Sequence, residues 1–85
     1  MKVLIPSALH SYTRSSRVEA SGSTLDEVLV DLDCQYPGIR FRMIDEQNRI
    51  REHIRLSINT HMTNDLNSAV KSGDVVHLIC ALSGG

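Results

Sequence analysis

Between residues 24 and 36, apolar residues recur at intervals of three and four positions. This spacing places their side chains in one stripe along one side of a helix. The stripe consists of Leu25, Val28, Leu29, Leu32 and Tyr36. Thr24 followed by Glu27 forms a capping box at the start, and Pro37-Gly38 ends the pattern. We therefore predict a helix of about three and a half turns, whose apolar stripe needs a sheet to lie on.

Four short segments have the pattern of β-strands. The runs "KVLIP" and "RVEAS" precede the predicted helix, and Pro6 stops the first of them. After the helix, residues 54–58 alternate strictly between apolar and polar, and "VVHLICAL" is a continuously apolar last strand. The first and last strands are the most apolar, so we expect both at the centre of the sheet, where both faces are covered.

The order strand, strand, helix, strand, strand predicts an α+β domain with the helix across one face of a mixed sheet of four to five strands. The helical stripe should pack on inward-facing strand residues, namely Val3, Ile5, Leu56, Ile58, Val76 and Leu78. The other segments give weaker signals. "SALHSYTRSS" is turn-prone, "IRFRMI" fits either a strand or a helical turn, and residues 60–74 are polar, with one anchoring turn at most.

Composition excludes several classes of function. A chain of 85 residues forms one small domain with a modest core and no deep active-site cavity. Nine Lys and Arg against ten Asp and Glu give a formal net charge of -1, and two tyrosines and one phenylalanine offer few stacking platforms, so we expect no nucleic-acid partner. The apolar runs are too short for a signal peptide or a membrane span, so we expect no membrane partner and a cytoplasmic location.

The charged residues are segregated along the chain. From Glu19 to Asp33 every charged residue is acidic, whereas from Arg40 to Arg55 five arginines face three acids. One interpretation is a pair of solvated faces. The alternative is a surface that steers a charged partner enzyme toward the protein.

The residues that most often bind metals or act in catalysis do not have the spacing of a site. Cys34 and Cys80 lie far apart and form no C-x-x-C pair, and no G-x-S-x-G elbow is present. The four histidines share no metal-ligand spacing: His10, His53, His61 and His77. We expect neither a metal nor a catalytic residue. We interpret Cys80 as a small residue closing the last strand; the alternative is a thiol that attacks or protects an activated tail.

The sequence ends in "ALSGG", and this glycine pair completes a family resemblance that spans the whole chain. The order of elements, the helix within "ASGSTLDEVLVDLDCQYPGI", the "SGDVV" turn and Gly84-Gly85 together resemble the ubiquitin-like sulfur carriers of the MoaD/ThiS family. The segments "IPSALHSYT" and "RVEASGSTLDEV" look most like the carriers of cysteine biosynthesis in this family. The chain departs from the family pattern at residues 80–83 and at the Asn59-Thr60 turn, where the family often has Asn-Gly.

The resemblance implies a β-grasp domain over residues 1–81 and a flexible tail over residues 82–85. It implies that a ubiquitin-activating-type enzyme adenylates the carboxylate of Gly85 with ATP, that a sulfur donor displaces AMP, and that the thiocarboxylate then supplies a sulfur-accepting synthase. Gly84, Ser83 and Leu82 would thread into the partner, since glycine has no Cβ to obstruct a narrow channel. The chain would then be a carrier and substrate rather than an enzyme, with no cofactor bound, and a monomer when free.

Strand alternation also predicts a docking surface. Period 2 turns Leu4, Pro6, His77 and Ile79 to the face of the sheet opposite the helix, and the family resemblance adds Met62. We expect these five residues, the outer-face patch, to form an exposed apolar surface for a partner. The alternatives to a carrier in cysteine biosynthesis are the small subunit of molybdopterin synthase, a thiazole sulfur carrier, and a non-covalent β-grasp interaction module with an incidental glycine tail.

Overall fold

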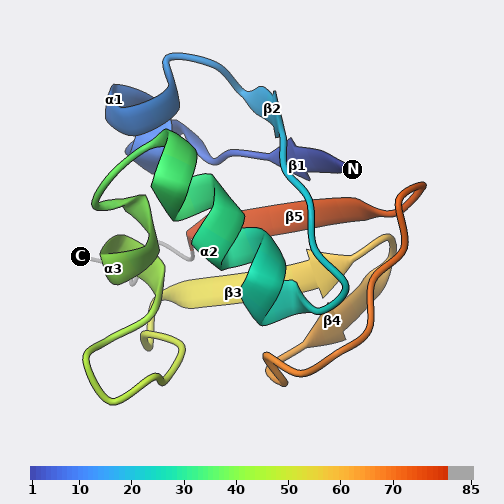
Figure 1. The fold of residues 1–85 in the computed structure, drawn as a ribbon. Helices are drawn as coiled ribbons and strands as arrows, with labels where there is room; N and C mark the ends of the chain where they lie inside the picture. Colours follow the sequence, from blue (N-terminus) through green and yellow to red (C-terminus); the bar gives the residue numbers. More distant parts are fainter. Residues whose placement is uncertain (81–85) are drawn as a thin grey trace.

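A five-stranded mixed sheet forms the body of the protein, and one long helix crosses its face (Figure 1). The structure is a computed structural model that describes residues 1–80. The elements in chain order are β1 (Lys2–Leu4), the 3-10 helix η1 (Ser7–Leu9), α1 (His10–Thr13), β2 (Arg17–Glu19), α2 (Leu25–Gln35), α3 (Ile39–Met43), β3 (Ile54–Ile58), β4 (His61–Thr63) and β5 (Val75–Cys80). The expectations for Leu82, Ser83, Gly84 and Gly85 lie outside the described residues.

The sheet has the strand order β2-β1-β5-β3-β4. β1 pairs with β5 in parallel, and the other three pairings are antiparallel. β1 and β5 therefore each have a neighbour on both sides, which confirms the prediction that the first and last predicted strands lie centrally. The predicted fold class, a mixed sheet with one main helix across one face, is confirmed as well.

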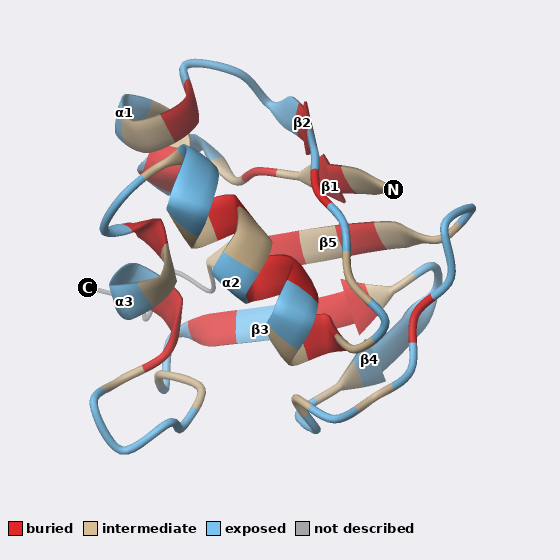
Figure 2. Ribbon diagram, viewed as in Figure 1, coloured by how far each residue is buried: buried red, intermediate tan, exposed pale blue. Residues whose placement is uncertain are grey.

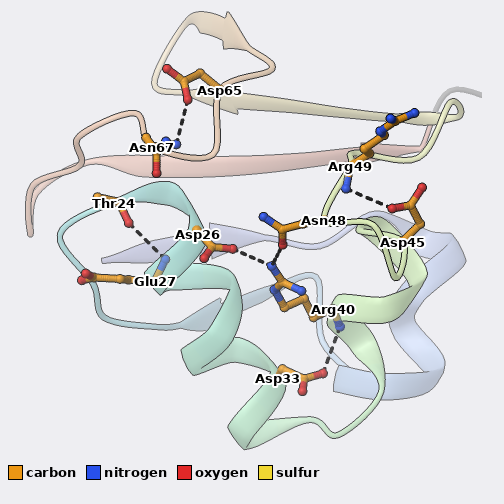
Figure 3. Close-up of polar contacts among 10 residues, drawn as sticks. All are labelled: Thr24, Asp26, Glu27, Asp33, Arg40, Asp45, Asn48, Arg49, Asp65 and Asn67. Carbon is orange, nitrogen blue, oxygen red and sulfur yellow. Dashed lines mark hydrogen bonds and ion pairs between the residues drawn. The ribbon is translucent and has the colours of Figure 1, made fainter.

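The start of α2 is fixed by the predicted capping residues. The Thr24 hydroxyl accepts a hydrogen bond from the Glu27 backbone N–H at 3.2 Å (Figure 3). The Glu27 carboxylate in turn accepts from the backbone N–H of Ser23 at 2.8 Å, one residue earlier than a standard capping box. At the other end, Tyr36 leaves the helical region with φ -131° and ψ 80°, because a following proline disfavours helical backbone. The helix is therefore about half a turn shorter than predicted.

The apolar stripe of α2 packs on the sheet and forms the core (Figure 2). Its members Leu25, Val28, Leu29 and Leu32 have no exposed surface. The predicted sheet partners are buried as well, except for Ile58, which is partly buried against the core. Burial of this many side chains supplies the main favourable free energy of folding.

Three segments with weak sequence signals have regular structure. "IRFRMI" is helical over α3, where Ile39 and Met43 are both fully buried. The turn-prone segment after β1 forms η1 and α1 and contributes Leu9 to the core. The prediction of one anchoring turn at most in residues 60–74 is wrong, because this segment contains β4.

No helix within residues 1–80 has both the length and the apolar character that crossing a membrane requires.

Candidate partner-binding face

A row of side chains crosses four strands on the face of the sheet opposite α2. Leu4 of β1 is paired with His77 of β5, His77 with Ser57 of β3, and Ser57 with Met62 of β4. Directly paired residues project to the same face of a sheet. The register therefore places Leu4, His77 and Met62, three residues of the outer-face patch, in one transverse row.

The other two residues of the patch flank this row. Ile79 lies two positions after His77 on β5, so it projects to the same face, where it is paired with Arg55. Pro6 follows β1 and is half-buried, and it belongs to no strand pairing. The structure thus brings four of the five residues onto one sheet face and leaves Pro6 just beyond the end of β1.

The outer face exposes apolar surface. Met62 is 60% exposed and Ile79 is 38% exposed, while Leu4 and His77 are half-buried. Ser57 is buried between them, and its hydroxyl donates a hydrogen bond to the backbone oxygen of Asn59 at 3.1 Å. Because the one hydroxyl in the row is already bonded, the row offers a partner mainly apolar contact.

Cys80 is the last residue of β5 and is paired with Ile54 of β3. Cys80 is partly buried against the core. Burial raises the pKa of the Cys80 thiol above its ordinary value, and the positive charge of Arg42 opposes this effect without overcoming it. The thiol is therefore protonated at neutral pH and is a weak nucleophile. This favours the interpretation of Cys80 as a small residue that closes the last strand.

A basic groove lies close to this end of β5. It has a volume of about 340 Å³ and is lined by Phe41, Arg42, Arg51 and His53. The guanidinium of Arg51 lies 4.6 Å from the centre of the Phe41 ring, and its Nε–H donates to the backbone oxygen of Phe41 at 2.7 Å. Sequence reasoning did not single out Phe41, although it is an apolar residue between two arginines; it is 56% exposed.

Arg40 is the one arginine of the basic segment that forms an ion pair within residues 1–80. Its guanidinium donates to Asp26 at 2.6 Å and to Asn48 at 2.7 Å, and its backbone N–H donates to Asp33 at 3.1 Å (Figure 3). These contacts connect α2, α3 and the following loop. Over residues 1–80 the only other ion pair joins the amino terminus to Glu19. Four arginines of the basic segment therefore form no ion pair in the described part of the chain: Arg42, Arg49, Arg51 and Arg55.

The histidines do not converge on a common site. Within residues 1–80, no three His, Cys, Asp or Glu side chains gather closely enough to hold a metal ion. His10 hydrogen-bonds the backbone oxygen of Ile5 at 3.0 Å through Nε2, which ties α1 to the end of β1. His77 belongs to the outer face, and His53 lines the basic groove.

This fold and strand order define the ubiquitin-like β-grasp class. The sequence model of the ThiS family matches residues 3–85, and the chain therefore belongs to the ThiS family. It is 32% identical to the sulfur carrier protein CysO of Mycobacterium bovis and of Mycobacterium tuberculosis, in an alignment that covers 98% of this chain and 96% of each relative. The family resemblance predicted from the sequence is confirmed.

Solved structures agree with this assignment. A chain from the Amycolatopsis orientalis BexX/CysO complex superimposes with a TM-score of 0.90 at 30% identity, covering 99% of this chain and 98% of the other. Mycobacterium tuberculosis CysO, described as an antigen, gives a TM-score of 0.89 at 30% identity, covering 95% and 98%. SAMP1 of Haloferax volcanii gives 0.81 at 25% identity, covering 100% and 98%.

Proposed function

We propose that this protein is a sulfur carrier whose Gly85 carboxylate is adenylated by a ubiquitin-activating-type enzyme and converted to a thiocarboxylate. The observation that carries the proposal is the family match, which extends through Gly84-Gly85. Relatives described as sulfur carriers align with 98% of the chain. Their description as CysO favours delivery of the sulfur to a synthase of cysteine biosynthesis over the molybdopterin and thiazole pathways.

The chemistry requires two substitutions. An oxygen of the Gly85 carboxylate attacks the α-phosphorus of ATP and pyrophosphate leaves, which gives an acyl adenylate. A sulfur nucleophile then attacks the acyl carbon and AMP leaves, so that one carboxylate oxygen is replaced by sulfur. The adenylating partner binds ATP and supplies the positioning and electrostatic stabilisation of both steps. In this proposal the protein is a substrate and carrier, has no cofactor of its own, and acts as a cytoplasmic monomer between its two partners.

The outer-face patch is the proposed docking surface for the adenylating enzyme. Its row Leu4, His77 and Met62 crosses the sheet, and Ile79 lies nearest to the end of β5 from which the tail continues. An exposed apolar surface of this kind is typical of a protein interface. The CysO of Amycolatopsis orientalis was solved in a complex with BexX, which supports partner binding by a protein of this shape.

Intact-mass spectrometry tests the proposed function. The full chain is incubated with the adenylating enzyme of its own organism, ATP and a sulfide source. The expected product has one oxygen replaced by sulfur, and fragmentation places the change on Gly85. A variant that lacks Gly85 is the control and should stay unmodified. An unchanged mass for the wild-type chain, with an enzyme shown to be active on another carrier, would overturn the proposal.

A further inference from the structure

The basic groove of Phe41, Arg42, Arg51 and His53 combines an exposed aromatic ring with arginines that form no ion pair within residues 1–80. Asp45 lies in the neighbourhood of Arg42 and Arg51: a hydrogen bond from the backbone N–H of Arg49 lowers the pKa of its carboxyl, and the positive charge of Arg51 adds to this effect. The Cys80 thiol near Arg42 is protonated at physiological pH, so it adds no negative charge beside the groove. The groove therefore presents cations that are available to an anion from another molecule.

Arg51 is held in an orientation that suits a carboxylate. Its guanidinium stacks on the Phe41 ring at 4.6 Å, and its Nε–H is bonded to the backbone oxygen of Phe41. No hydrogen bond to its two terminal nitrogens is formed by any residue from 1 to 80. A guanidinium fixed in this way loses little conformational entropy when it binds a carboxylate through both nitrogens. The exposed Phe41 ring adds an apolar surface for the methylene groups of a Glu or Asp side chain.

The groove also lies beside the point from which the tail continues. Arg42 is close enough to Cys80 to influence the pKa of its thiol, and Cys80 is the last described residue. A protein that receives residues 81–85 must surround the chain at this point. If the partner's channel holds residues 81–85 extended, they span roughly 17 Å, and nucleotide phosphates at the Gly85 carboxylate would then lie well beyond the groove. The rim of the receiving protein would lie next to it.

We infer that the basic groove binds an acidic peptide segment at the rim of the adenylating enzyme's tail channel. The inference rests on the proposed function, because it names a second contact with the same partner. The outer-face patch contributes apolar contact across the sheet, while the groove orients the base of the tail through carboxylate–guanidinium pairs. Such peripheral pairs act mainly on the association rate and on specificity, and they weaken as salt rises.

The first test uses backbone-amide NMR on the isolated full chain. The probe is a short acetylated, amidated peptide rich in Glu, with a matched Gln peptide as its control. The acidic peptide should shift the signals of residues 41, 42, 51 and 53, and the Gln peptide should not. The double variant Arg42→Glu/Arg51→Glu should lose the response. Equal shifts with both peptides, or no shifts, would overturn the inference.

A nuclear Overhauser contact between Gly85 and the Phe41 ring in the free chain would also overturn it, because the chain's own tail would then occupy the groove.

The second test measures ATP–pyrophosphate exchange with the adenylating enzyme. Arg42→Glu and the double variant should raise the KM for the carrier, by roughly 10- to 50-fold for the double variant at low salt, because each reversal replaces attraction with repulsion. The kcat should change little, since the groove contacts the ground state and the transition state alike. Lys71→Glu is the matched control, because Lys71 is exposed and precedes β5 at the end of that strand opposite Cys80.

The two tests separate the inference from the proposed function. Arg42 is exposed and makes no ion pair within residues 1–80, so the single variant Arg42→Glu should fold normally even if Arg51→Glu disturbs the Phe41 stack. No exchange with the wild-type chain would contradict the proposed function while leaving peptide binding to be seen by NMR. Normal wild-type exchange, with both groove variants as active as Lys71→Glu, would contradict the inference alone.

Discussion

Replacement of Gly22 by alanine should destabilise the fold, because there is no space for a side chain at this position. Gly22 lies in the turn between β2 and α2. A Cβ built on it would lie 2.7 Å from the backbone nitrogen of Val28, 2.8 Å from the Cβ of Glu27 and 2.9 Å from the carbonyl carbon of Glu27. Two of these three atoms belong to the backbone of the helix and cannot rotate away. Gly22→Ala must therefore move the turn away from α2.

The size of the effect follows from the contacts that this movement strains. The turn holds the hydrogen bonds of the helix start, from Ser23 N–H to Glu27 and from Glu27 N–H to Thr24. Loss of a helix cap costs about 1 kcal/mol, and inserting a methyl group into a packed site costs roughly 1–3 kcal/mol. The free energy of unfolding should fall by about 2–4 kcal/mol. For a domain of this size, this corresponds to a melting temperature lower by roughly 10–30 °C.

Urea denaturation followed by circular dichroism measures this difference, and Gly73→Ala is the matched control. No atom lies within 4 Å of a Cβ built on Gly73. The control should therefore stay within about 0.5 kcal/mol of the wild type or gain slightly from a less flexible unfolded chain. Equal stability of the two variants would refute the reasoning, since it would mean that the turn before α2 yields to a methyl group without cost.

Three further predictions concern the core, the outer face and the tail. Leu29→Ala should lower the free energy of unfolding by about 2–5 kcal/mol, because Leu29 is fully buried. An unchanged denaturation midpoint would contradict the placement of Leu29 in the core. Ile79→Asp should weaken calorimetric binding to the adenylating enzyme, whereas Val30→Asp, at an exposed position on α2, should not. Deletion of Gly85 should abolish pyrophosphate exchange without changing the melting temperature. It shifts the terminal carboxylate away from its position in the partner's active site, and a displacement of even 1 Å can reduce a rate about 100-fold. Full exchange would favour the non-covalent interaction module.

The part of the fold that was predictable from the sequence has strong local signals. The stripe, the cap at Thr24 and the stop at Pro37 specify α2 without reference to the rest of the chain. β4 has no such signal. It has only three residues, His61, Met62 and Thr63, and none of them is buried, so the segment is too short and too exposed to show a buried apolar face. Its position depends on pairing with β3, which is a tertiary contact.

The segment "IRFRMI" shows how tertiary contacts decide an ambiguous pattern. A strand would put Ile39, Phe41 and Met43 on one face, whereas a helix puts only Ile39 and Met43 together. The structure buries Ile39 and Met43 completely and leaves Phe41 56% exposed. Gly38 supports the helix by adopting φ 98° at its start, a conformation that other residues rarely reach. The exposure of Phe41, which completes the basic groove, could not be read from the pattern.

The residues of the outer-face patch also differ in whether the sequence alone predicts their position. Strand period places His77 and Ile79 on the outer face from sequence alone, but Met62 joins them only through the register of β3 with β4. That register is set by the Asn59-Thr60 turn, where Asn59 adopts φ 57° and accepts a hydrogen bond from the backbone N–H of Val75. Asparagine tolerates this left-handed conformation. The departure from the Asn-Gly pattern therefore leaves the turn intact.

β5 explains why folding and partner binding should respond to different substitutions. Its inward residues Val76 and Leu78 are buried beneath α2, while His77 and Ile79 alternate with them on the outer face. A change at an inward position opens a cavity in the core and lowers stability. Ile79 is 38% exposed and lies outside the core cluster, so a polar change there leaves the core intact and acts on docking. Because β5 also ends at Cys80, where the tail continues, one central strand fixes the core, the docking face and the starting point of the tail relative to one another.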